Sequence, residues 1–259
     1  MTVDAVSLLG LVLFAFLAGA LDAMVGGGGL IQLPATVLLL PAGMPAVVAL
    51  GTSKLASLCG TAVAAVTYYR RMPPDSAVVT PLTAAAFAGS FLGARLATAL
   101  PPEALEPVIL ALLLAVAVFT WRRPELGSTT RARLAARTQL VAAALLGAGV
   151  GAYDGFFGPG TGTFLILGLI TIVGLDFLHA SAAAKIANTA TNLAALIVFA
   201  AAGAVLWPEG AVMAAANVGG SVVGARLALR YGNRFVRRVF LVVVSALIAR
   251  LAYDVLVAR

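Results

Sequence analysis

Charged side chains are scarce in this sequence. Its 259 residues include 17 Lys and Arg and 10 Asp and Glu, so only 10% are charged while 62% are hydrophobic. A soluble domain averages about 25% charged and 45–50% apolar residues, and this chain lacks the charge to cover a surface that faces water. The shortage excludes a soluble enzyme, a nucleic-acid-binding module and a disordered chain. Apolar runs near or above the ~20 residues that cross a bilayer core instead predict a polytopic membrane protein.

Reactive residues are also few. The single cysteine, Cys59, excludes an internal disulfide, and the single histidine, His179, gives no metal site. No catalytic triad, phosphate-binding loop or redox pair is recognisable, so we expect no enzyme activity and no cofactor. No basic stretch precedes the first apolar run, and we therefore expect that run to stay in the membrane rather than to be cleaved as a signal peptide.

Ten apolar stretches follow one another along the chain. Two of them, 30–40 and 163–174, are too short to cross a bilayer, at ~16–18 Å for a rise of 1.5 Å per residue. Each follows a glycine cluster, and glycine and proline interrupt helices. Each short stretch therefore forms either its own span or part of a broken or re-entrant hairpin, which leaves eight or ten spans. The stretches lie at 5–25, 30–40, 46–69, 77–99, 105–121, 139–157, 163–174, 180–203, 210–229 and 239–257.

The two halves of the chain repeat each other. Residues 89–97 (GSFLGARLA) recur at 220–228 (GSVVGARLA), with seven of nine positions identical at an offset of 131. Lys54 and Lys185 share this offset, and Asp22 and Asp154 lie 132 positions apart. We therefore expect a first membrane repeat at 1–121, a basic linker at 122–137 and a second membrane repeat at 138–259.

Arginines predict the orientation of the chain. They gather at 70–71, 122–138 and 230–238, and these three loops fall on one side whether the chain has eight or ten spans. An excess of Lys and Arg marks cytoplasmic loops, so we expect the 122–138 loop in the cytoplasm and both termini outside a cell (inner or plasma) membrane. Equivalent loops of the two halves carry opposite charge bias. The halves are therefore predicted to be inverted repeats of 4–5 transmembrane segments each, as in many secondary transporters.

Two lysines stand inside apolar stretches. A charge at that depth costs at least ~2.5–3.5 kcal/mol and usually faces a cavity or a partner, although each lysine can also snorkel to the interface. Lys185, Asn188 and Asn192 share one helix face, and the corresponding residues of the first half are Lys54, Ser57 and Thr61, preceded by Thr52 and Ser53. We interpret this repeated polar stripe as an anion site; the alternative is hydrogen bonding between helices.

The glycine clusters extend the predicted site. A broken helix offers free backbone N–H groups and the positive end of its dipole, which together bind anions. Asp22 and Asp154 precede the clusters by four residues in both halves, and we expect them to form ion pairs or to carry coupling protons. The predicted substrate-binding residues are Lys54, Lys185, Gly27, Gly28, Gly29, Thr52, Ser57, Gly160, Thr161, Gly162, Asn188 and Asn192.

These motifs resemble a known family. Residues 19–29 (GALDAMVGGGG) with Pro34, followed by 49–54 (ALGTSK), are similar to the sulfite exporter TauE/SafE family of membrane permeases, and the second glycine motif with Lys185 resembles its repeat. The resemblance covers the whole chain and implies export or uptake of small sulfur-containing anions such as sulfite or organosulfonates. One departure is that Lys185 follows three alanines, without the Thr and Ser that precede Lys54.

The expected function is therefore secondary transport of a small anion by alternating access. The lipid bilayer is the expected surrounding and protons are a candidate coupling ion, with no nucleic-acid partner. Two alternatives remain at this point: a passive anion channel on the same scaffold, and a non-transporting membrane subunit of an enzyme or assembly system. The direction of transport and the oligomeric state also stay open.

Overall fold

The computed structural model describes residues 3–41, 43–101, 104–105, 108, 111 and 135–231, and contains helices but no strands among them. Six of these helices are long and apolar enough to cross a membrane. The expected all-α membrane architecture is confirmed. The predicted span at 239–257 and most of the predicted linker at 122–137 and of the predicted span at 105–121 lie outside the described residues. The six helices are α1 (Ala5–Val25), α3 (Ala46–Arg71), α4 (Ser76–Ala99), α6 (Ala136–Phe156), α8 (Phe177–Ala201) and Trp207–Tyr231.

Two shorter helices follow the glycine clusters, as predicted. They are α2 (Gly29–Leu39) and α7 (Thr161–Gly168), which continues as a π-helical turn, η1 (Leu169–Val173). At 1.5 Å per residue they reach about 16 and 20 Å, well short of a ~30 Å hydrocarbon core. Glycine makes the breaks, because Gly26 at the end of α1 and Gly160 at the start of α7 adopt φ values of 78° and 85°, a region that side-chain-bearing residues rarely enter.

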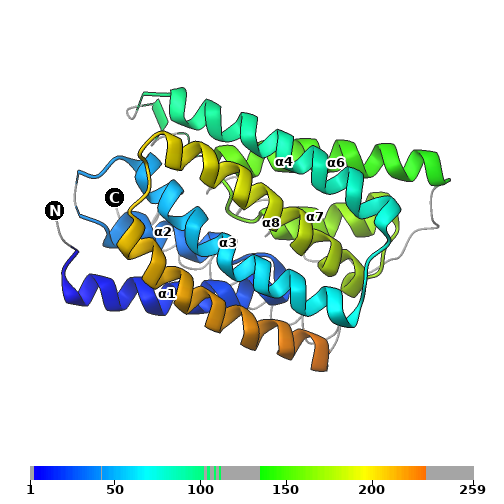
Figure 1. Ribbon diagram of the computed structural model, residues 1–259, viewed down its shortest axis with the longest axis horizontal. Coiled ribbons are helices and arrows are strands. Elements are labelled where there is room, and N and C mark those ends of the chain that lie inside the picture. The colour runs from blue at the N-terminus through cyan, green and yellow to red at the C-terminus, as the bar shows by residue number, and fades with distance from the viewer. Residues whose placement is uncertain are drawn as a thin grey trace.

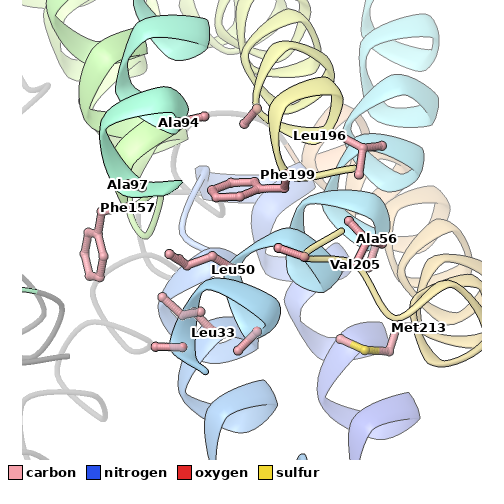
Figure 2. Close-up of a cluster of buried hydrophobic side chains, with 14 of the residues drawn as sticks. Leu33, Leu50, Ala56, Ala94, Ala97, Phe157, Leu196, Phe199, Val205 and Met213 are labelled. Atoms are coloured by element: carbon pink, nitrogen blue, oxygen red, sulfur yellow. The ribbon is translucent and has the colours of Figure 1, made fainter. Parts of the chain in front are cut away.

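Helix α8 is the central helix of the bundle. Its apolar window is 72% buried, against 28–50% for the other five spanning helices. Its packing partners include α3 and α4, and Phe199 of α8 lies in an apolar cluster with Leu50 and Leu196 (Figure 2). The polar residues of α3 and α8 therefore belong to the interior of the bundle rather than to its lipid-facing surface.

Close backbone approach joins the two halves at two places. A Cβ atom on Gly93 of α4 would lie 2.1 Å from the carbonyl oxygen of Ala152 in α6, and one on Gly224 would lie 2.1 Å from that of Ala20 in α1. Only glycine permits such contacts, a device common between membrane helices. Gly93 and Gly224 are equivalent in the sequence repeat, and so are Ala152 and Ala20, so one contact recurs at both places.

Corresponding helices run in opposite directions in Figure 1. Helices α1 and α3 run from the end marked N toward the far end of the bundle, whereas α6 and α8 run back toward it. The end of α3, the start of α6 and the end of Trp207–Tyr231 all lie toward that far end. The described arginines of the three basic loops, Arg70, Arg71, Arg137 and Arg230, therefore lie at one end of the molecule.

Candidate functional site

The two glycine breaks contact each other. A Cβ atom on Gly26 would lie 2.3 Å from the carbonyl carbon of Gly162. The backbones of the two glycine segments that interrupt the helices are therefore in contact. Thr163 secures this contact, because its backbone N–H donates to the Gly26 carbonyl oxygen at 3.1 Å and its hydroxyl donates to the Val25 carbonyl oxygen at 3.1 Å. Segments from the two halves thus build one shared centre between the spanning helices.

Both lysines form ion pairs with the opposite half. The Nζ atom of Lys54 lies 2.8 Å from Oδ2 of Asp154, and Nζ of Lys185 lies 2.9 Å from Oδ2 of Asp22. Lys185 Nζ also donates to the backbone carbonyl of Asp22. The side chains of Lys54 and Lys185 are 6% and 0% exposed, so neither snorkels to the interface. Each half supplies the acid for the lysine of the other.

Gly158 makes room for one of these pairs. A Cβ atom there would lie only 2.8 Å from Nζ of Lys54, and the residue has a φ of 102°. Both the space and the backbone conformation therefore require glycine. The second glycine motif positions the Lys54 ammonium group as well as ending its own helix.

A small cavity surrounds the Lys54–Asp154 pair. Its volume is about 40 Å³, which holds on the order of three water-sized groups at ~10–15 Å³ each. Eight of the twelve predicted substrate-binding residues line it, together with both acids. Those eight are Lys54, Gly29, Ser57, Gly160, Thr161, Gly162, Asn188 and Asn192, and the acids are Asp22 and Asp154.

Four predicted binding residues lie away from the cavity wall. Lys185 is fully buried behind it, paired with Asp22. Gly27 and Gly28 are buried in the turn between α1 and α2. The Thr52 hydroxyl accepts a hydrogen bond of 3.0 Å from the backbone N–H of Leu206, which ties α3 to the loop after α8.

The cavity also includes polar residues that the prediction of the site omitted. Gln32 of α2 is 1% exposed and lines the cavity. Its amide donates to the Ser53 carbonyl oxygen at 2.8 Å and accepts from Nδ2 of Asn217 at 2.6 Å. The position of this glutamine, inside a short apolar stretch that follows a glycine cluster, could have indicated a cavity residue. The partnership with Asn217, 185 positions away, had no such signal.

No metal centre is evident among the described residues, where no group of three His, Cys, Asp or Glu side chains converges. The cavity instead offers one ammonium group, two carboxylates, and amide and hydroxyl groups between the helices. Such a set can hold a small charged solute and exchange a proton with it.

The architecture defines a class of protein. Spanning helices, two interrupted helices that meet between them, and a buried charged cavity at the meeting point are features of membrane transporters. Comparison with known proteins agrees with this class. Over residues 11–251 the chain matches the family described as Sulfite exporter TauE/SafE, and it belongs to that family.

Curated relatives are described as probable membrane transporters. The probable membrane transporter protein ORF9 of a Sinorhizobium species is 37% identical over 240 residues, covering 93% of this chain and 90% of the relative. The probable membrane transporter protein YfcA of Escherichia coli K12 is 36% identical over 250 residues, covering 95% and 90%. A probable membrane transporter protein of Haemophilus influenzae is 33% identical over 239 residues, covering 92% of each. No solved structure matches the chain.

Proposed function

We propose that this chain is a secondary transporter of a small anion, with sulfite, an organosulfonate or a related sulfur-containing anion as its substrate. The observation that carries the proposal is the ammonium group of Lys54, buried beside Asp154 in the wall of a polar cavity. A cavity of about 40 Å³ suits an anionic head group of a few heavy atoms. A long substrate would need a wider opening.

The charges around the cavity suggest how the anion is coupled to protons. With all four groups ionised, the two lysines and two aspartates sum to zero. An anion brought into this site meets two carboxylates in a low dielectric, which is costly. Protonation of Asp154 frees Lys54 and leaves one net positive charge for the anion to neutralise. Anion and proton then bind and leave together, so a proton gradient drives the anion.

Neighbouring groups support anion binding. Thr161 and Gly162, at the beginning of α7, line the cavity, and the N-terminus of a helix attracts anions through its dipole and free N–H groups. The amide groups of Asn188 and Asn192 face the same space and offer N–H donors to oxyanions.

The arrangement of the halves supports alternating access by two inverted repeats. Corresponding helices run in opposite directions (Figure 1), and the glycine contact of Gly93 with α6 recurs as that of Gly224 with α1. Rocking one half against the other would expose the shared centre to each side in turn. The arginine-rich end then faces the cytoplasm under the positive-inside rule.

Flux into proteoliposomes under an imposed pH gradient tests the proposal, with sulfite, a short sulfonate, sulfate and chloride as separate substrates. The double variant Lys54→Met/Asp154→Asn removes both charges together, which avoids leaving one charge buried and unpaired, and we expect its flux to fall to background. Asp154→Asn alone imitates the protonated acid. We expect it to keep anion-dependent thermal stabilisation, worth ~2.7 kcal/mol at 100 times the dissociation constant, but to lose acceleration by the pH gradient.

Three results would contradict parts of this proposal. If the double variant transports as fast as the exposed control Arg95→Gln, Lys54 is not part of the binding site. Unitary currents in a voltage-clamped planar bilayer would show that the protein is a channel rather than a carrier. A folded wild-type protein that neither transports nor is stabilised by any of the four anions would support a non-transporting subunit.

A further inference from the structure

A second pocket lies at the arginine-rich end of the bundle. It has a volume of about 500 Å³ and lies between the last turns of α3 and of the helix Trp207–Tyr231. Four arginines from these two helices line it, Arg70 and Arg71 from the first and Arg226 and Arg230 from the second. All four are exposed.

No described carboxylate offsets this charge. The pocket wall contains no acidic residue, and none of the ion pairs found in the described part of the chain includes an arginine. Arg230 makes one internal contact, with its guanidinium carbon 5.4 Å from the centroid of the Tyr231 ring. In the sequence, the segment 232–238 contains three arginines and no acidic residue. A single arginine is common at the C-terminal end of a membrane helix, where its charge interacts favourably with the helix dipole. That preference does not explain four arginines that converge from two helices without counter-charges.

The surface beside the arginines is apolar. Val66, Val222 and Leu229 line the pocket beside the arginines, and Val66, one helical turn before Arg70, is 50% exposed. Tyr69 and Tyr231, 57% and 53% exposed, stand at the level of the arginines, where aromatic side chains mark the membrane–water interface. A ligand in this pocket meets both guanidinium groups and apolar side chains.

We propose that this pocket binds the head group of an anionic phospholipid, with the phosphodiester held by the arginines and an acyl chain lying along Val66 and Val222. Arginine suits this task because its planar guanidinium group donates two parallel hydrogen bonds to phosphate. Basic pockets between membrane helices are known to hold such head groups. The exposed apolar strip favours a lipid over a free oxyanion, which would gain nothing from it. The proposal does not depend on the transported substrate.

Lipid titration of the purified full-length chain in neutral detergent tests this site. Thermal stability and the number of lipids retained, counted by native mass spectrometry, are measured with phosphatidylglycerol, phosphatidylcholine and inorganic phosphate at matched ionic strength. We expect only phosphatidylglycerol to raise the unfolding temperature. Since each arginine near a membrane surface contributes about fivefold in affinity, Arg70→Gln/Arg226→Gln should weaken apparent binding about 30-fold.

Arg95 provides a matched control. It is the repeat equivalent of Arg226, is exposed, and lies outside the pocket on α4, so Arg95→Gln should stay within twofold of the wild type. If the double variant fails to fold, the single variants Arg70→Gln and Arg226→Gln should each lose about fivefold. Equal stabilisation by phosphatidylcholine, or an equal loss in Arg95→Gln, overturns the proposal. So does an equal response to inorganic phosphate, which would make the pocket a site for free oxyanions.

Discussion

The ion pair between the deepest lysine and the opposite half offers a quantitative test of the fold. Lys185 is 0% exposed, and its ammonium group contacts both the carboxylate and the backbone carbonyl of Asp22. In Lys185→Met the side chain keeps its approximate length but loses its charge, so the Asp22 carboxylate remains, 14% exposed, without a cation. Breaking a buried pair in this way costs about 3–5 kcal/mol, or roughly 6–20 °C in unfolding temperature for a protein of this size.

The partner substitution should be milder. In Asp22→Asn the ammonium group keeps the Asp22 carbonyl, and the new amide still has an oxygen that can accept a hydrogen bond. The double variant Lys185→Met/Asp22→Asn removes both charges, and a neutral replacement of a buried pair is often tolerated, so most of the lost stability should return.

Thermal unfolding of the four purified proteins, followed by intrinsic fluorescence, completes this double-mutant cycle. The expected order of stability places the wild type and the double variant highest, Asp22→Asn next and Lys185→Met lowest. A Lys185→Met protein that unfolds within 2 °C of the wild type would refute the pairing. A double variant no more stable than Lys185→Met would show that the loss of stability does not come from the unpaired Asp22 carboxylate.

Three further substitutions test local parts of the structure. In Gly220→Ala the new Cβ would lie 1.9 Å from a carbonyl oxygen of α1, so we expect a clear drop in unfolding temperature, whereas the control Gly149→Ala, with nothing within 4 Å, should gain up to about 1 kcal/mol of helix propensity. Tyr68→Phe removes a buried hydrogen bond of 2.9 Å from its hydroxyl to a carbonyl of α1 and should cost about 0.5–1.5 kcal/mol by the same assay. Asp176 caps α8, and Asp176→Ala should cost about 1 kcal/mol. Partial burial raises the pKa of the Asp176 carboxyl, but hydrogen bonds from His179 outweigh that effect and hold the pKa below its usual value. The capping contribution is therefore present above pH 4 and is lost as the pH falls through that lowered pKa, so a cost of Asp176→Ala that stays the same at pH 3 and pH 7 would contradict this account.

Much of the fold follows from patterns that operate over short distances. Glycine clusters interrupt helices whatever surrounds them, so the short helices α2 and α7 could be expected from the sequence. A lysine within an apolar stretch must find a partner or a cavity because the bilayer offers neither. Lys54 and Lys185 accordingly point inward from α3 and α8, the helices that contact each other at the centre of the bundle.

Other features depend on contacts that no local pattern encodes. An acid lies four residues before each glycine cluster, but the sequence does not show which lysine each acid contacts. In the structure the ion pairs cross between the halves. The hydrogen bond from Asn217 to Gln32 joins residues that share no repeat relation. Such partners are decided by the way long helices pack together, which depends on their whole surfaces.

The departure from symmetry around the two lysines has a physical consequence. Lys54 follows Ser53, whose hydroxyl donates to Thr36 at 3.1 Å, and Lys54 lines the cavity. Lys185 follows Ala184, fully buried, and lies behind the wall. The contacts between helix backbones recur in both halves, whereas the polar groups around the cavity do not. Repeated helix contacts thus carry one lysine that lines the cavity and one that does not, so we expect substitutions at Lys54 to affect transport and those at Lys185 to affect mainly stability.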